Sequence, residues 1–208
     1  MIRRVFTVVV ISFLAYSNSL AQRFSCGLKP GIDIVDQQYK GSVVPPASFN
    51  PRISWDIAGY CNFKLSKRIQ IQVEPGYAEK GSSLLYIGAT KPVILTYGYI
   101  QTPLILKISP VKKLFIDLGA EFGYLVSSRR QEEDGTVHYS TDLHNANRNE
   151  FSGLLGLSYI LTTRFSFSIR YSYQFKPIFD GYAQIDPGPS VPYKIFNRQL
   201  CAGLYYAF

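Results

Sequence analysis

Apolar and polar residues alternate with a period of two along most of the chain after residue 23. In the clearest run, RFSFSIRYSYQF at 164–175, aromatic or aliphatic residues occupy every odd position, with serine, arginine or glutamine between them. This period is typical of β-strands with one apolar and one polar face, and no helical period competes with it. Eight such strands are predicted, at residues 24–35, 52–65, 69–79, 93–108, 114–127, 150–161, 165–175 and 195–208.

The predicted connections alternate strictly between short and long. The short ones are 66–68, 109–113 and 162–164, and the long ones are 36–51, 80–92, 128–149 and 176–194. Strict alternation indicates an antiparallel up-and-down meander with every tight turn at one end. Short periplasmic turns and longer extracellular loops are the pattern of outer-membrane barrels.

Alternation alone fits two kinds of barrel, a soluble one with an apolar ligand cavity and a membrane one with its apolar face turned outward. Charges of both signs share the polar face with glycine and serine, which suits the narrow interior of an eight-stranded barrel. Aromatic residues gather near strand ends, as in interfacial girdles. In lipid such a sheet must close, because open edges would leave backbone groups unpaired. We therefore predict an all-β, eight-stranded, antiparallel up-and-down transmembrane β-barrel with short periplasmic turns and long extracellular loops.

The first 21 residues are predicted to be a cleaved signal peptide. Arg3 and Arg4 form a basic start, residues 5–15 are apolar, and Ser19-Leu20-Ala21 supplies a small-x-small cleavage pattern. The apolar run is shorter than the roughly 18 residues of a spanning helix. Residues 22–208 would then form the exported barrel domain, and its formal charge falls from +8 to +6 with the loss of the two arginines. Export makes nucleic acid an implausible partner.

The final segment, LCAGLYYAF, places an alternating strand at the end of the chain. Its apolar parity contains Leu204, Tyr206 and Phe208, which we expect to face lipid. A closing strand with a final aromatic residue resembles the C-terminal signal that the outer-membrane assembly machinery reads. Assembly through that machinery is therefore expected.

Several stretches together resemble the PorT-like family of small outer-membrane "porin family" barrels. They are EPGYAEKG (74–81), GYIQTPLILK (98–107), FIDLGAEFGYLVS (115–127), FSGLLGLSYIL (151–161), FSFSIRYSYQF (165–175) and FNRQLCAGLYYAF (196–208). The resemblance implies an eight-stranded barrel of the OmpX/OmpA type, no shared catalytic residue, and for some members a link to protein secretion. Gln101 stands where a carboxylate would be expected, which leaves a charge pair at that position in doubt.

One set of charged residues shares the predicted inward face. We predict a salt-bridged lumen that its own side chains fill, because buried charges must be paired and an eight-stranded interior barely exceeds its side chains in width. The alternative is a polar path for ions. The set comprises Lys29, Asp33, Asp56, Glu74, Asp117, Glu121 and Arg170.

Cationic residues flank the strands at both ends. Arg129 and Arg130, with Lys40, Lys80 and Lys91 in other long loops, form either a lipopolysaccharide phosphate site or an ordinary solvated rim. The short-turn end carries a second group that would face anionic lipid headgroups. Its members are Lys67, Arg68, Lys112, Lys113 and Arg164.

Two further kinds of chemistry are considered from the sequence: a site built around the two histidines, and a disulfide bond. His138 and His144 lie near Ser140, Asp142 and Glu132/Glu133, but a polar loop does not fix a hydrolytic set, and the spacing matches no metal-ligand pattern. Cys26 could pair with Cys61 or Cys201 if the barrel closes. The favoured interpretation is three small buried cysteines of no special role.

The expected function is therefore non-enzymatic, without a cofactor or metal. The protein would act in envelope structure or surface interaction, with an accessory role in secretion or assembly as one form of it. Expected partners are outer-membrane lipids and lipopolysaccharide, the assembly machinery, and a protein bound through the extracellular loops. Alternatives are a narrow channel for small solutes, a lipid-modifying enzyme and a soluble periplasmic ligand-binding barrel.

Overall fold

A computed structural model of the chain describes residues 24–41, 47–132, 134–140, 146–184 and 190–208. No helix in this part of the chain is long and apolar enough to cross a membrane. The predicted signal peptide, residues 1–21, lies outside the described residues. The strands are β1 (Phe24–Gly41), β2 (Ala47–Asn50), β3 (Arg52–Lys64), β4 (Ile69–Val73), β5 (Gly76–Tyr86), β6 (Val93–Val111), β7 (Leu114–Gln131), β8 (Val137–Ser140), β9 (Asn149–Ile160), β10 (Phe165–Gln174), β11 (Phe179–Gln184) and β12 (Ser190–Ala207).

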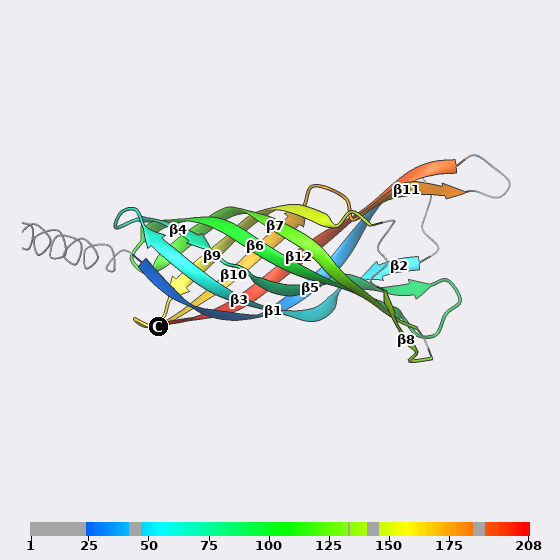
Figure 1. Ribbon diagram of the computed structural model, residues 1–208, viewed down its shortest axis with the longest axis horizontal. Coiled ribbons are helices and arrows are strands. Elements are labelled where there is room, and N and C mark those ends of the chain that lie inside the picture. The colour runs from blue at the N-terminus through cyan, green and yellow to red at the C-terminus, as the bar shows by residue number, and fades with distance from the viewer. Residues whose placement is uncertain (1–23, 42–46, 133, 141–145, 185–189) are drawn as a thin grey trace, which may run out of the picture.

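The strands form one closed antiparallel barrel (Figure 1). Going round the ring, β1 pairs with β3, and β3 pairs with both β4 and β5, which occupy one position in the ring. The order then continues through β6, β7, β9, β10 and β12. The ring closes where β1 pairs β12 over a long register, from Gly27 opposite Ala207 to Gly41 opposite Tyr193. The eight spanning strands confirm the predicted all-β antiparallel barrel.

One spanning strand is interrupted where β4 ends and β5 begins. Cys61 pairs with Val73 and Ala58 with Gly76, so the register against β3 is the same on both sides of the interruption. Pro75 lies between them, and proline removes a ladder donor without ending the extended conformation. The carbonyl of Pro75 still accepts a hydrogen bond from the Gly59 amide at 3.0 Å. β4 and β5 are therefore one spanning strand, as the single predicted segment 69–79 implies.

The barrel is polar inside and apolar outside. Among the described residues, polar and charged side chains outnumber apolar ones in the buried class, whereas many large apolar side chains are exposed, including Ile53, Leu155 and Ile169. A water-soluble barrel would reverse this arrangement, because the hydrophobic effect favours burial of apolar surface. The apolar parity of the strands therefore faces outward, toward lipid.

The long connections contain more strand than the sequence predicts. β1, β7 and β12 run beyond their expected bounds into the long connections, and β5 continues to Tyr86, well into the expected loop 80–92. The short strands β2, β8 and β11 pair with β5, β7 and β12 respectively. These extensions lie together at the end opposite the tight turns (Figure 1). The sheet extends there through pairing between strands outside the membrane. The local alternation of apolar and polar residues does not predict this pairing.

The cysteines differ from the favoured interpretation. Cys26 and Cys61 are directly opposite in the β1–β3 register and form a disulfide. Both face outward, while Cys201 is a buried free thiol on the inward side of β12. The interpretation of three unlinked cysteines is thus wrong for two of them, because β1 and β3 are consecutive antiparallel strands whose register places Cys26 opposite Cys61.

Candidate functional site

Within the described residues, ten acidic and basic side chains are buried inside the barrel, and we call them the lumen network. All seven predicted inward charges belong to it, and Lys80, Lys107 and Glu150 join them. Lys80 was expected in an extracellular rim and is instead almost fully buried, because β5 continues past residue 79 with the same parity. The network comprises Lys29, Asp33, Asp56, Glu74, Lys80, Lys107, Asp117, Glu121, Glu150 and Arg170.

Arg170 bridges the middle of the lumen. Its Nη1 lies 2.7 Å from Glu74 Oε1 and its Nε 2.8 Å from Asp117 Oδ2. β10 and the β4–β5 strand lie on opposite sides of the ring, so the Arg170–Glu74 pair spans the whole interior. Tyr205 donates a hydrogen bond to Glu74 at 2.9 Å, and Ser158 donates one to Asp117 at 2.9 Å. Such extra donors are what a buried ion pair needs to offset its desolvation.

A second bridge lies nearer the extracellular end. Lys80 Nζ on β5 lies 2.5 Å from Glu121 Oε1 on β7 and 2.6 Å from Glu150 Oε1 on β9. Ser152 donates a further hydrogen bond to Glu150 at 2.8 Å. This bridge joins three spanning strands across the lumen.

The remaining charges form local pairs, with one exception. Lys29 binds Asp56, and Lys107 Nζ lies 3.4 Å from Asp117 Oδ1. Asp33 is fully buried, yet neither of its carboxylate oxygens has a hydrogen-bond partner. Gln101, whose charge pair was in doubt, is buried with Oε1 also unpartnered and takes no part in an ion pair.

An apolar cap covers the network toward the extracellular side. Tyr97, Tyr99, Leu125 and Ile178 pack together as a buried cluster. Ile178 follows β10, and its amide and carbonyl bond to Ile195 and Asn147 at 2.8 and 2.7 Å. The segment after β10 therefore packs against side chains of β6 and β7 at this end of the lumen.

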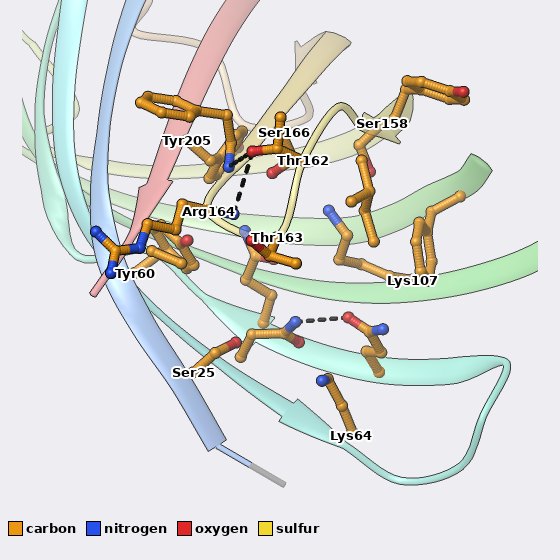
Figure 2. A pocket seen from close by; sticks show the side chains of 18 residues that line it. Ser25, Tyr60, Lys64, Lys107, Ser158, Thr162, Thr163, Arg164, Ser166 and Tyr205 are labelled. Atoms are coloured by element: carbon orange, nitrogen blue, oxygen red, sulfur yellow. Dashed lines mark hydrogen bonds between the residues drawn. The ribbon is translucent and has the colours of Figure 1, made fainter. Parts of the chain in front are cut away.

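The opposite end opens into a vestibule of about 150 Å³. The side chains of Lys64, Lys107 and Arg164 line it together with amides and hydroxyls, and no carboxylate is among its lining residues (Figure 2). Tyr205 lines it too and contacts Glu74 behind it. The vestibule therefore ends at the lumen network.

The extracellular cations do not form one cluster in the described part of the chain. Arg130 pairs with Glu132, Nε to Oε1, at 2.5 Å, and this hydrogen bond raises the pKa of the Arg130 guanidinium. Lys40 donates a hydrogen bond to the Tyr173 hydroxyl at 2.8 Å. Arg129 on β7 is half-buried and Lys91 is exposed. These residues fit a solvated rim as well as a phosphate site.

The hydrolytic set considered from the sequence is only partly described. His138 lies on β8, where it is exposed and pairs in register with Arg130. Glu133, Asp142 and His144 lie outside the described residues, and a hydrolytic role for this loop stays untested.

The C-terminal residues point as the alternation predicts. Leu204 and Phe208 are exposed on the outer face, at 44% and 80%, and Tyr206 is half-buried against Phe165. The Phe208 amide donates a hydrogen bond to the Cys26 carbonyl at 3.1 Å, so the last residue lies at the closing seam. Their role as an assembly signal stays a prediction.

Comparison with known proteins identifies what this architecture is similar to. A family model described as "Outer membrane protein beta-barrel domain" matches residues 16–180. Among solved structures, Neisserial surface protein A is 14% identical, with a TM-score of 0.50 over 88% of this chain and 97% of that one. This likeness shows the fold alone.

Two further barrels show weaker similarity. The attachment invasion locus protein Ail of Yersinia pestis, solved in complex with the heparin analogue sucrose octasulfate, is 10% identical with a TM-score of 0.46, over 89% of this chain and 99% of that one. OprG from Pseudomonas aeruginosa has the same identity and TM-score, over 89% and 96%. No curated protein matches the chain.

Proposed function

The chain belongs to the outer membrane protein β-barrel domain family, and from this premise we propose that it is a non-enzymatic barrel with a closed lumen. It resides in the outer membrane of a Gram-negative bacterium, in keeping with its family and with the outer-membrane barrels it is similar to. Its role would lie in envelope structure or in surface interaction through the extracellular extensions.

The observation that carries the proposal is the filling of the lumen. Ion pairs that join opposite spanning strands cross the interior, and an apolar cap lies between them and the extracellular side. An eight-stranded barrel has little interior width beyond its side chains. Rapid solute passage would require several of these contacts to break together.

The extracellular extensions support the surface-interaction part of the proposal. Tyr139 on β8 and Tyr182 on β11 are 77% and 74% exposed, at the tips of a sheet that rigid strands hold in place. Exposed tyrosines on a rigid scaffold are typical anchors of protein contacts. Proposed partners are therefore a surface protein and the lipids around the barrel, with Arg129 and Arg130 as candidate contacts for lipopolysaccharide phosphates.

The resemblance to PorT-like barrels suggests a more specific role within this proposal. It favours an accessory role in protein secretion or assembly across the outer membrane, with the C-terminal strand recognised by the assembly machinery. Crosslinking of the native protein at the cell surface, followed by identification of the captured protein, tests this accessory role.

Planar-bilayer recording tests the closed lumen. We expect no steady unit conductance from the wild-type barrel. A double variant, Arg170→Ser with Glu74→Ser, removes the pair that spans the lumen and should raise conductance above that baseline. A variant of the exposed Lys91, Lys91→Ser, is the matched control and should remain silent.

A narrow channel is the alternative, and the vestibule favours it because it opens the lumen from one end. Steady unit conductance of the wild type would establish this alternative and contradict the closed lumen. A lipid-modifying enzyme would instead change the mass spectrum of lipid A when the protein is present.

A further inference from the structure

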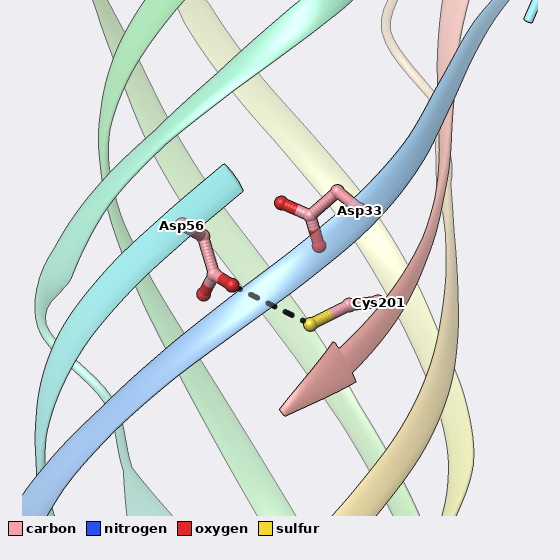
Figure 3. A group of neighbouring side chains, drawn as sticks. All are labelled: Asp33, Asp56 and Cys201. Carbon is pink, nitrogen blue, oxygen red and sulfur yellow. Dashed lines mark hydrogen bonds between the residues drawn. The ribbon is translucent and has the colours of Figure 1, made fainter. Parts of the chain in front are cut away.

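Three chemically distinctive side chains converge inside the barrel, next to the Lys29 pair. Asp33 on β1, Asp56 on β3 and Cys201 on β12 come from three neighbouring spanning strands and face one another (Figure 3). One donor atom from each lies within 4.8 Å of the others. Cys201 Sγ is 3.6 Å from Asp56 Oδ1.

The local sequence makes room for this cluster. Gly31 is opposite Asp56 on one side and opposite Gly203 on the other. A side chain at Gly31 would collide with the Asp56 carboxylate and lie 3.3 Å from Cys201 Sγ. The missing side chain therefore leaves the space into which the carboxylate and the thiol project.

Asp33 is the observation that points to a ligand. It is fully buried, and both of its oxygens lack a hydrogen-bond partner. Each of the other five carboxylates of the lumen network has a cation within 4.0 Å. An isolated buried carboxylate is costly, and such groups are normally paired or coordinate a metal.

A second unpartnered group lies beside the cluster. Gln199 is the next inward residue before Cys201 on β12, and its Oε1 is buried without a hydrogen-bond partner. Gln199 and Cys201 also line a small cavity of about 20 Å³. An amide oxygen and a carboxylate, both lone-pair donors, thus adjoin the thiol.

We propose that Asp33, Asp56 and Cys201 bind one divalent cation of borderline softness, with Zn²⁺ as the first candidate. A thiolate with two carboxylates suits Zn²⁺, whereas Mg²⁺ and Ca²⁺ prefer oxygen alone. Zinc lies about 2.0–2.3 Å from such donors, so the three groups would rotate inward around it. Gln199 Oε1 or a water completes four-fold coordination.

Charge balance supports a divalent ion. Lys29 binds Asp56 through Oδ2 and neutralises it, which leaves Oδ1 on the side of Cys201. Binding releases the proton of the Cys201 thiol to solvent. The thiolate and the Asp33 carboxylate then neutralise the two positive charges of the metal, and no net charge remains in the cluster.

Refolding of the full barrel with Zn²⁺, followed by removal of loosely bound metal with a weak chelator, tests the proposal. We expect one zinc per chain by elemental analysis. With Co²⁺ as the probe, a thiolate-to-cobalt charge-transfer band should appear and should vanish in Cys201→Ser. Asp33→Asn should weaken binding by more than the roughly 10–100-fold typical of losing an outer hydrogen-bond partner.

Glu150→Gln is the matched control, because it removes a lumen carboxylate outside the cluster and should leave zinc content unchanged. If Asp33→Asn does not refold, X-ray absorption of the zinc-loaded wild type provides the test, with one sulfur ligand expected. A chain that retains no metal, or a bound metal with no sulfur ligand, overturns the proposal. An infrared band of a protonated carboxylic acid that disappears in Asp33→Asn, in a chain that retains no metal, would show that Asp33 is instead neutral.

Discussion

Individual charges in this lumen depend on one another more than on the solvent. Arg170, Glu74 and Asp117 are each nearly fully buried, so bulk water does not solvate their charges. Removing one partner of a buried pair leaves an uncompensated charge, whereas removing the pair as a unit is often close to neutral. The mutational behaviour of the network should therefore be strongly non-additive.

Arg170→Met should lower the free energy of unfolding by about 3–5 kcal/mol, because Glu74 and Asp117 would remain buried without their shared cation. The triple variant Arg170→Met with Glu74→Gln and Asp117→Asn should recover most of that loss. Urea titration of barrels folded into lipid vesicles measures both. Arg164→Met, at the exposed short-turn end, is the control, and a comparable loss there would refute the reasoning.

Strand parity predicts which residues face inward, but it does not predict their partners. All seven charges assigned to the lumen are buried because a period of two fixes the face of each residue. Lys80 was missed because the expected strand ended at residue 79, one residue before Lys80, whereas β5 continues to Tyr86. The Asp33–Asp56–Cys201 cluster depends on the register between three strands, which the sequence of each strand does not specify.

At the scale of strands and turns, some features follow from the local sequence and others depend on pairing between distant segments. The tight turns are predictable because Ser66, Thr162 and the Lys112-Lys113 pair interrupt the alternation. In the structure Ser66 and Thr162 oxygens accept hydrogen bonds from amides two and three residues later. The extracellular strands β2, β8 and β11 were expected as loops, since short strands of this kind are stabilised by pairing with longer neighbours.

The apolar cap around Ile178 is an element whose stability can be tested separately. Ile178→Ala should loosen the cap, because losing a buried isoleucine side chain costs about 2–5 kcal/mol. Hydrogen exchange at the Ile178 and Asn147 amides should then accelerate while exchange in β10 and β12 changes little. The exposed Ile87, at 86%, supplies the control variant Ile87→Ala; faster exchange there as well would argue against a distinct cap.

At the scale of the whole molecule, the apolar exterior is stable only if the sheet has no open edge. Every spanning strand has two neighbours because β1 pairs β12, and lipid offers no donors or acceptors to an unpaired edge. The seam between these two strands is also the pairing most distant in sequence. Its formation carries the largest loop-closure entropy cost of the pairings in the ring, because it joins the two ends of the barrel domain.

A cysteine pair across the seam tests this closure directly. Leu28 and Tyr206 are opposite one another on the outer face, and opposite residues on neighbouring strands lie within the reach of a disulfide. In a background with the three native cysteines replaced by serine, Leu28→Cys with Tyr206→Cys should crosslink on mild oxidation. Heated, non-reduced protein should then migrate faster than the linear chain, because nearly its whole length becomes one covalent loop.

Phe165 is opposite Tyr206 on its other side, so Leu28→Cys with Phe165→Cys places the thiols two strands apart and should not crosslink. Equal crosslinking in both variants, or none in the first, would mean that β1 and β12 do not close the barrel.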